Sequence, residues 1–360
     1  MSSDLATSIA TTPKTNHHSV RSGLVRWESA LVVALLAVLL LGAFTPNFFT
    51  QTNFFYTGLN IGEIAIMALP LTLIIITGEI DLSVASMLGL SSTMLGLLFK
   101  HGWPIGLAIV AVLVMGVLGG ALNGVLITRL GLPSIAVTIG TLTLFRGIAQ
   151  VLLGAKSVTG FPASLTKIGV APLPHTHVAY SIGIFVVLAL GFGLVLHGTP
   201  TGRSIFAIGL QAEAARFSGI RVLRIKFLLY VLSSTMCAFA GVLWTLRFAT
   251  ARYDAGTGLE LSVVAIVLFG GVSIFGGRGT ILGVCLAAAV MACLQQVLTL
   301  RLVDPQVRNI VTGLLLLVSV VLPNLGDAVR RLRAPSRHRT GSVSPTSVPA
   351  SHQPASPNKG

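Results

Sequence analysis

The chain alternates between long apolar runs and short polar segments over most of its length. A transmembrane helix needs about 20 mostly apolar residues to cross roughly 30 Å of hydrocarbon. Ten runs approach or reach that length: 28–45, 59–77, 82–99, 104–127, 133–153, 178–197, 224–247, 260–275, 280–300 and 309–323. The runs at 260–275 and 309–323 are short, which leaves a range of eight to eleven spans. The pattern predicts an all-α, polytopic integral membrane protein with about ten transmembrane helices.

Polar tails flank this region. Residues 1–27 are rich in Ser, Thr and His and lack periodicity, and residues 326–360 are rich in Ser, Pro and Arg. Such compositions bury too little apolar surface to fold, so both segments are expected to be disordered cytoplasmic tails, the second one basic. The sequence therefore predicts a membrane-spanning domain over residues 28–325 between two tails.

Composition and charge agree with a membrane protein. Hydrophobic residues make up 53% of the chain and charged residues 9%, against about 25% charged in soluble domains. The net charge of +14 is not accompanied by a nucleic-acid-reading motif. If the N-terminus is placed in the cytoplasm, sixteen basic residues fall on that side and seven outside, with Arg146 inside a run. This asymmetry predicts both termini inside and an even number of spans.

The residues that usually carry catalysis or bind metal do not cluster in the sequence. Cys237, Cys285 and Cys293 lie in apolar runs without a CxxC pair, and His175 and His177 lie in a Pro-rich outer loop without a third ligand nearby. These patterns are typical of core cysteines and ordinary loop residues. No convergent set favours an integral-membrane enzyme, and we expect no bound metal or cofactor.

The longest polar segment between spans covers residues 198–226. Good helix formers at 211–217 predict a short helix there, and Gly219 is suited to end it in a left-handed conformation. Ala214 and Ala215 would give this helix a flat surface that fits a groove on a partner protein. An amphipathic connector between two spans is the alternative.

This segment resembles the coupling loop of ABC importer permeases of the branched-chain amino acid/ribose class, which read close to Gly-x-Asn-x-x-Ala-Ala-x-x-Ser-Gly-Ile. Leu210 stands where Asn is usual. The matching positions are Gly209, Glu213, Ala214, Ala215, Ser218, Gly219 and Ile220.

Three further blocks are similar to the same family. Residues 78–86 read GEIDLSVAS and resemble GGIDLSVGS, with Glu79 and Ala85 as departures. Residues 133–147 resemble the family's TLGT…RG block, and residues 258–280 its EL…LGGxSxxGGxG block, with Ser262 where Asp is common. Glu79 and the stretch 68–76 look closest to the rhamnose-type and autoinducer-2-type branches.

The resemblance implies a permease without its own ATPase, and the chain has no GxxxxGK[ST] phosphate loop. It further implies a bacterial cytoplasmic (inner) membrane protein that works as a homo- or heterodimer with a cytoplasmic ABC ATPase subunit and an extracytoplasmic solute-binding protein. ATP would be used by the ATPase. The expected solute is a monosaccharide or related small polyhydroxylated compound, such as rhamnose, a ribose-like sugar or autoinducer-2.

Polar residues within or beside the apolar runs are candidates for the translocation pathway, because charges at mid-bilayer are costly. Each has a structural alternative. Arg146 can reach the outer interface, the acidic residues can cap helices, and the asparagines can bond between helices. The candidates are Asn60, Glu79, Asp81, Asn123, Arg146 and Glu260, and Glu63 shares the capping alternative.

Two further hypotheses remain open at this stage. An ion-coupled secondary transporter would place acidic residues at the midplane, whereas here they lie near predicted span ends. A weak echo between the segments beginning at Ile61 and at Gly258 suggests a parallel internal repeat. Composition alone could also produce this echo.

Overall fold

The computed structural model describes residues 17–333, and these residues form helices without any strand. The helices are α1 (His17–Ala43), α2 (Gln51–Ile76), α3 (Val84–Lys100), α4 (Ile105–Thr128), α5 (Ser134–Leu153), α6 (Ala163–Val170), α7 (Tyr180–Gly198), α8 (Pro200–Leu210), α9 (Ala212–Phe217), α10 (Val222–Phe248), α11 (Leu259–Phe269), α12 (Ile281–Leu300) and α13 (Pro305–Arg333). The chain divides into a unit Met1–Val321 and a unit Leu322–Gly360. Of the second unit, the structure describes only the last part of α13.

Each of the ten apolar runs coincides with one helix, which confirms the all-α class. Six helices are long and apolar enough to cross a membrane, namely α2, α4, α5, α7, α10 and α12. Three apolar helical stretches are shorter: α3, α11 and the part of α1 from Trp27 to Ala43. The total of ten spans and the side of the termini stay predictions, as do the tails, most of whose residues lie outside the described range.

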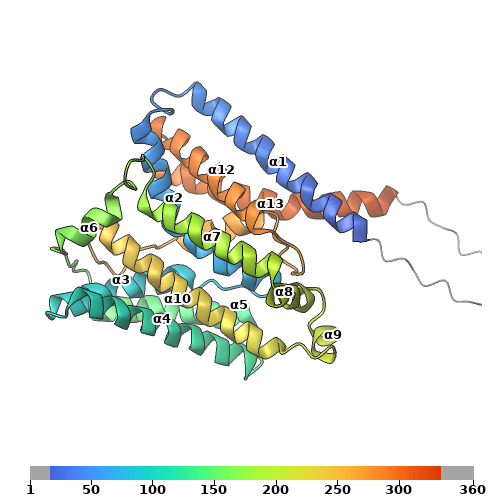
Figure 1. Ribbon diagram of the computed structural model, residues 1–360, viewed down its shortest axis with the longest axis horizontal. Helices are drawn as coiled ribbons and strands as arrows, with labels where there is room; N and C mark the ends of the chain where they lie inside the picture. Colours follow the sequence, from blue (N-terminus) through green and yellow to red (C-terminus); the bar gives the residue numbers. More distant parts are fainter. Residues whose placement is uncertain (1–16, 334–360) are drawn as a thin grey trace, which may run out of the picture. The chain divides into compact units, whose positions relative to one another are not determined.

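Contacts between helix ends show how the long helices alternate in direction. Asn53 near the start of α2 accepts a hydrogen bond from Gln296 near the end of α12. Glu79, just after α2, pairs with Lys226 near the start of α10. The bundle therefore has an α9 end, where α2 finishes and α10 and α12 begin, and an α6 end, where α2 begins and α10 and α12 finish (Figure 1).

α2 occupies the centre of this bundle. It contacts α7, α10, α11 and α12, and its residues from Ala65 to Ile76 are all buried. α10 packs along α4 as well, and α1 lies beside α12 (Figure 1). Small residues permit the α4–α10 contact, because a Cβ on Gly120 would come within 2.5 Å of the Tyr230 carbonyl oxygen.

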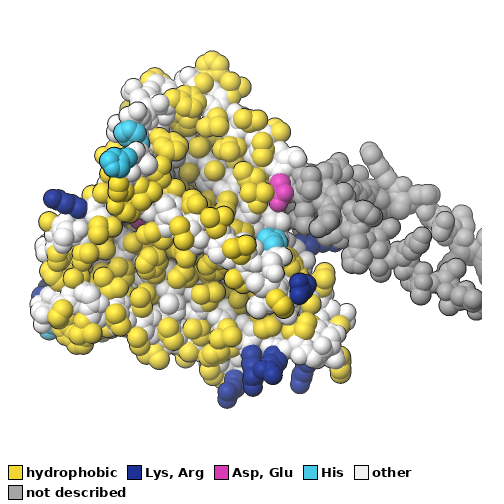
Figure 2. Space-filling model, viewed as in Figure 1, with side chains coloured by type: hydrophobic (Ala, Val, Ile, Leu, Met, Phe, Trp, Pro, Cys, Tyr) yellow, Lys and Arg dark blue, Asp and Glu magenta, His cyan; other side chains and the backbone are white. Residues whose placement is uncertain are grey.

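The outer surface carries the amphipathic signature of a membrane protein. Hydrophobic side chains cover most of the visible face, and Lys and Arg gather at the lower right, near α9 and the start of α10 (Figure 2). Large exposed apolar residues on α4 and α7, such as Leu118 and Val187, make these faces unsuited to water.

Candidate functional site

The segment between α7 and α10 folds as two short helices because its sequence supplies a start and a stop. The Thr199 hydroxyl accepts a hydrogen bond from the Gly202 amide at 3.3 Å, which caps α8, and Pro200 occupies its first turn. Extended backbone at Gln211 separates α8 from α9. α9 ends before Gly219, whose φ of 84° is the left-handed conformation that the sequence predicts.

One face of α9 packs against α8 and α10, and the other face is free. Ala215 is buried in a small apolar cluster with Ile208 of α8 and Val222 of α10. Phe217 is 89% exposed and Leu210 is 70% exposed. The predicted residues Glu213, Ala214, Ser218 and Gly219 are also exposed. Phe217 and Leu210 together expose apolar surface on an otherwise polar segment, and partner proteins commonly cover surface of this kind. The sequence did not lead us to predict Phe217 as a site residue, although its position in the last turn of the predicted helix could have indicated it.

Gly209 brings the backbone of this segment into direct contact with the backbone of the bundle core. A Cβ at Gly209 would lie 1.8 Å from the Ile76 carbonyl oxygen and 2.4 Å from the Gly277 amide nitrogen. The Gly277 amide donates to the Ile76 carbonyl at 2.8 Å. Three chain segments therefore meet here without intervening side chains: the last turn of α8, the end of α2 and the loop before α12. We call this contact the glycine junction.

Glu79 forms a second link at the α9 end. Its carboxylate pairs with the Lys226 ammonium, and the two side chains are only 17% and 15% exposed. Lys226 is the fifth residue of α10, the helix that follows the α8–α9 segment. The pair connects the loop after α2 to the helix that continues from α9.

Asp81 and Asn123 are brought together in one buried network. Asp81 accepts hydrogen bonds from the Ser83 amide at 2.9 Å and the Ser83 hydroxyl at 2.6 Å, and from the Ser233 hydroxyl at 3.3 Å. Asn123 donates to the Ser83 hydroxyl at 3.0 Å. Both Asp81 and Asn123 are at most 1% exposed. The network holds the loop before α3 against α4 and α10, an arrangement that stabilises a helix start.

Arg146 fixes the loop between α10 and α11. Its guanidinium donates to the carbonyl oxygens of Tyr253 at 2.9 Å and Ala255 at 2.8 Å. A longer contact of 3.4 Å reaches the Ala85 carbonyl oxygen in the first turn of α3. Glu260, in the first turn of α11, is close enough to interact electrostatically with Arg146. The arginine therefore turns inward to the backbone and does not extend to the lipid interface.

Asn60 lies in a separate polar cluster, toward the α6 end. Arg247 in the last turn of α10 donates to the Asn60 side-chain oxygen and, at 2.9 Å, to the Glu63 carboxylate. Glu63 is 1% exposed and lies well inside α2, so it forms an ion pair and does not cap a helix. Its i, i+3 spacing from Asn60 places both side chains on one helix face. The sequence did not predict a role for Arg247, because its partners Glu63 and Asn60 lie more than 180 residues away along the chain.

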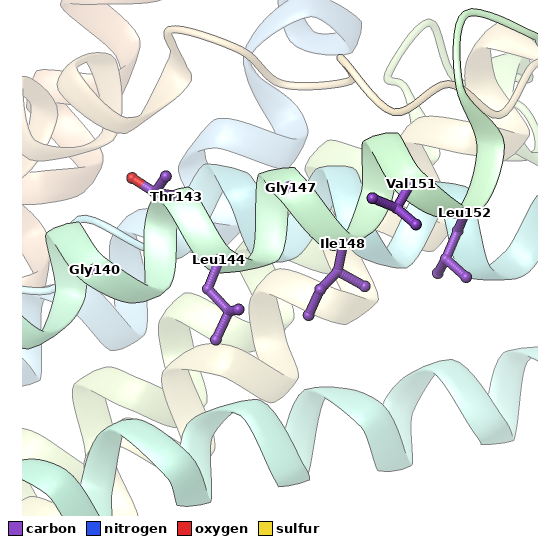
Figure 3. A pocket seen from close by; sticks show the side chains of 7 residues that line it. All are labelled: Gly140, Thr143, Leu144, Gly147, Ile148, Val151 and Leu152. Atoms are coloured by element: carbon purple, nitrogen blue, oxygen red, sulfur yellow. The ribbon is translucent and has the colours of Figure 1, made fainter.

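A hollow on the outer face of α5 is apolar and shallow. Figure 3 shows its lining by Gly140, Thr143, Leu144, Gly147, Ile148, Val151 and Leu152, all from one helix. The Thr143 hydroxyl already donates to the Ile139 carbonyl oxygen at 3.2 Å. With no other polar side chain in its lining, this hollow lacks the groups that would orient a polar solute.

Comparison with known proteins gives a consistent assignment. Residues 53–320 match the model of the family described as "Branched-chain amino acid transport system / permease component". The chain is 36% identical over 309 residues to the autoinducer 2 import system permease protein LsrD of Klebsiella pneumoniae subsp. pneumoniae, a match covering 82% of this chain and 91% of the relative. It is 35% identical over 302 residues to LsrD of Salmonella paratyphi A, covering 82% and 90%. No solved structure matches the chain.

Proposed function

The chain belongs to the permease-component family of branched-chain amino acid transport systems, and from that premise we propose that it is the membrane-spanning subunit of an ATP-binding-cassette importer. It is a multi-pass protein of the bacterial inner membrane. Transport components of this kind are not enzymes. ATP hydrolysis belongs to a partner ATPase, which fits the lack of a phosphate-binding loop in the sequence.

The proposed topology has ten crossings, with the α9 end in the cytoplasm and the α6 end outside. Alternating helix directions support it, because helices that meet end to start at both ends of the bundle must cross it in opposite senses. Basic residues in the α8–α9 segment and at the start of α10, including Arg203, Arg216, Arg221 and Arg224, suit the cytoplasmic side.

The free face of α9 is the observation that carries the coupling proposal. It presents exposed Phe217 and Glu213 on a helix whose other face is seated on α8 and α10. A cytoplasmic ABC ATPase would dock there and move the α8–α9 segment when ATP closes it. The movement would reach the bundle through two direct contacts, the glycine junction to α2 and the Glu79–Lys226 pair.

The solute we propose is a monosaccharide or a related small polyhydroxylated compound, with autoinducer-2 and rhamnose as the first candidates. Support comes from relatives whose names state autoinducer 2 import. An extracytoplasmic binding protein would deliver the solute at the α6 end, and a second permease subunit, the same or different, would complete the pore.

Two variants test the coupling site. Phe217→Ala removes an aromatic side chain whose burial is worth about 1.5–3 kcal/mol, which should weaken ATPase association roughly ten- to hundredfold. Glu213→Arg should do the same by reversing a charge. The matched control is Phe49→Ala, which truncates a 70% exposed phenylalanine on the loop between α1 and α2.

The measurement is recovery of the ATPase with the tagged full-length chain from its native membrane, identified by mass spectrometry and quantified by ATP hydrolysis. Equal recovery with Phe217→Ala, Glu213→Arg and Phe49→Ala would show that the ATPase docks elsewhere. Uptake of labelled autoinducer-2, rhamnose, ribose and xylose by a deletion strain, complemented with the wild-type gene, identifies the solute. Uptake that survives ATP depletion but stops with a proton uncoupler would instead establish a secondary transporter.

A further inference from the structure

A polar groove opens between the start of α2 and the end of α12, at the α6 end of the bundle. Its volume is about 510 Å³, within the roughly 300–1,000 Å³ typical of small-molecule sites. Its polar lining includes Thr52, Asn53, Tyr56 and Asn60 from α2, and Gln296 and Thr299 from α12. None of these residues carries a charge at neutral pH.

The α2 side of the groove is a stripe of polar side chains, which are unsuited to contact with lipid. Thr52, Tyr56 and Asn60 recur at a spacing of four residues and are all exposed. Asn60 lies nine residues beyond the first residue of α2, or about 14 Å along the helix at 1.5 Å per residue. Polar side chains at such depth face water or a polar ligand, because facing hydrocarbon is costly.

Some of the lining groups are used to hold the two helices together. Gln296 donates to the Asn53 side-chain oxygen, and the Asn53 amide donates to the Phe48 carbonyl oxygen at 2.7 Å. The Asn60 oxygen accepts from Arg247, whose charge is matched by Glu63. The walls of the groove are thus fixed, and the neighbouring cation is neutralised.

Other lining groups remain available to a ligand. Within the described residues, the Thr52 hydroxyl, the Tyr56 hydroxyl, the Asn60 amide nitrogen and the Gln296 side-chain oxygen have no hydrogen-bond partner in the protein. They combine hydrogen-bond donors and acceptors, and the exposed Tyr56 ring offers an apolar face to C–H groups. Uncharged hydroxyl-rich solutes match this combination, because no lining residue itself supplies a charge. The Arg308 guanidinium, which donates to the Thr299 hydroxyl at 2.7 Å, is the cation bonded to the α12 side of the groove.

We propose that the α2–α12 groove is an entry subsite that holds an uncharged polyhydroxylated solute through Thr52, Tyr56, Asn60 and Gln296 before it passes through the permease. The inference rests on the proposed function for the direction of transport. The binding chemistry of the groove can be tested without transport.

The direct test is solute protection of an introduced thiol. Full-length chain carrying Thr52→Cys, in native membranes with its partners, is labelled with a membrane-impermeant charged thiol reagent, with and without autoinducer-2, rhamnose or ribose. The control, Gln51→Cys, is exposed at the helix start but does not line the groove. The unsubstituted chain measures labelling of the native cysteines. We expect one or more of the probes to slow labelling of Thr52→Cys but not of Gln51→Cys.

Kinetics supply an independent reading. Tyr56→Phe removes only the phenolic oxygen, and Asn60→Leu also releases Arg247. Losing one solute hydrogen bond should raise the uptake KM roughly tenfold with Vmax unchanged, whereas Gln51→Leu should leave KM unchanged. A structural role alone would lower Vmax and protein level instead.

The two proposals fail separately. If the wild-type chain transports a probe, but no probe protects Thr52→Cys and Tyr56→Phe keeps the wild-type KM, the groove is not a solute site. If a solute protects Thr52→Cys but uptake is independent of ATP, the subsite is supported and the assignment as an ATP-driven importer is wrong.

Discussion

Gly209 sits where the last turn of α8 touches two other backbones, so an alanine there should disrupt the α9 end specifically. The added methyl would start 1.8 Å from the Ile76 carbonyl oxygen, and nearby atoms must move by about 1.6 Å to restore an ordinary contact near 3.4 Å. Flexible side chains cannot absorb this movement, because the opposing atoms belong to backbone. The hydrogen bond from Gly277 to Ile76 lies directly in the way.

The expected loss can be estimated from these two effects. Overpacking a tight contact costs about 1–3 kcal/mol, and leaving a buried backbone group without its partner costs about 1–3 kcal/mol. The Gly209→Ala chain should therefore lose about 2–6 kcal/mol of unfolding free energy if both occur in full. Total stabilities are about 5–15 kcal/mol, so the effect should be readily measured. The control is Gly140→Ala on α5, where a Cβ would meet no atom within 4 Å.

Thermal unfolding in detergent, followed by a dye that fluoresces on reaction with thiols, suits this comparison, because Cys237 is fully buried and reacts only on unfolding. The background from Cys285 and Cys293, which are partly buried, is common to all variants. The Gly209→Ala chain should melt well below the wild type and Gly140→Ala at or slightly above it. If both variants melt together, the close approach of α8 to α2 is not rigid and the reasoning fails.

Three more predictions follow from the polar contacts. Lys226→Met should destabilise the protein by about 1.5–3 kcal/mol, the usual value of a hydrogen bond to a charged group. Adding Glu79→Gln should recover part of this loss, because it removes the unpaired carboxylate. If the two losses simply add in thermal unfolding, the residues are not a coupled pair. Arg146→Met should leave two backbone carbonyls of the α10–α11 loop without donors and speed hydrogen exchange there, whereas Arg129→Met, which removes an exposed arginine at the end of α4, should not. The Arg252 guanidinium lowers the pKa of Asp254 through their hydrogen bond. The pair therefore stabilises its loop fully above the ordinary aspartate pKa of about 3.9, and the stabilisation is lost as the pH falls through the lowered pKa of Asp254. Hydrogen exchange of the loop, corrected for its intrinsic pH dependence, should therefore become less protected in the wild-type chain over that pH range. In an Asp254→Asn chain the protection should not change over the same range.

The helices could be predicted from sequence because lipid imposes a local rule. Each spanning segment must be apolar and must satisfy its own backbone hydrogen bonds, so a run of suitable length already indicates a helix. α9 was predictable for another local reason, a stretch of helix formers ending at Gly219. α6 was not predicted. Its eight residues carry no apolar run and lie in a loop.

The polar contacts could not be predicted in the same way, because they join residues distant in sequence. Glu63 and Arg247 are 184 residues apart, and nothing in the pattern around either one indicates its partner. Asp81 and Asn123 were each identified, but not as members of one network. Arg146 was expected either to serve the pathway or to reach the interface, and only the folded loop shows the two carbonyls that it contacts.

The complete burial of α2 from Ala65 to Ile76 bears on how the protein is assembled. In the folded bundle α2 contacts α7, α10, α11 and α12, and the apolar side chains of this stretch are covered by protein. The apolar side chains of this stretch serve packing in the folded bundle. They are also required earlier, because α2 enters the membrane before α7 to α12 have been synthesised and must be stable in lipid without them. Assembly then exchanges lipid for protein around α2 at little hydrophobic gain, and close packing drives that step.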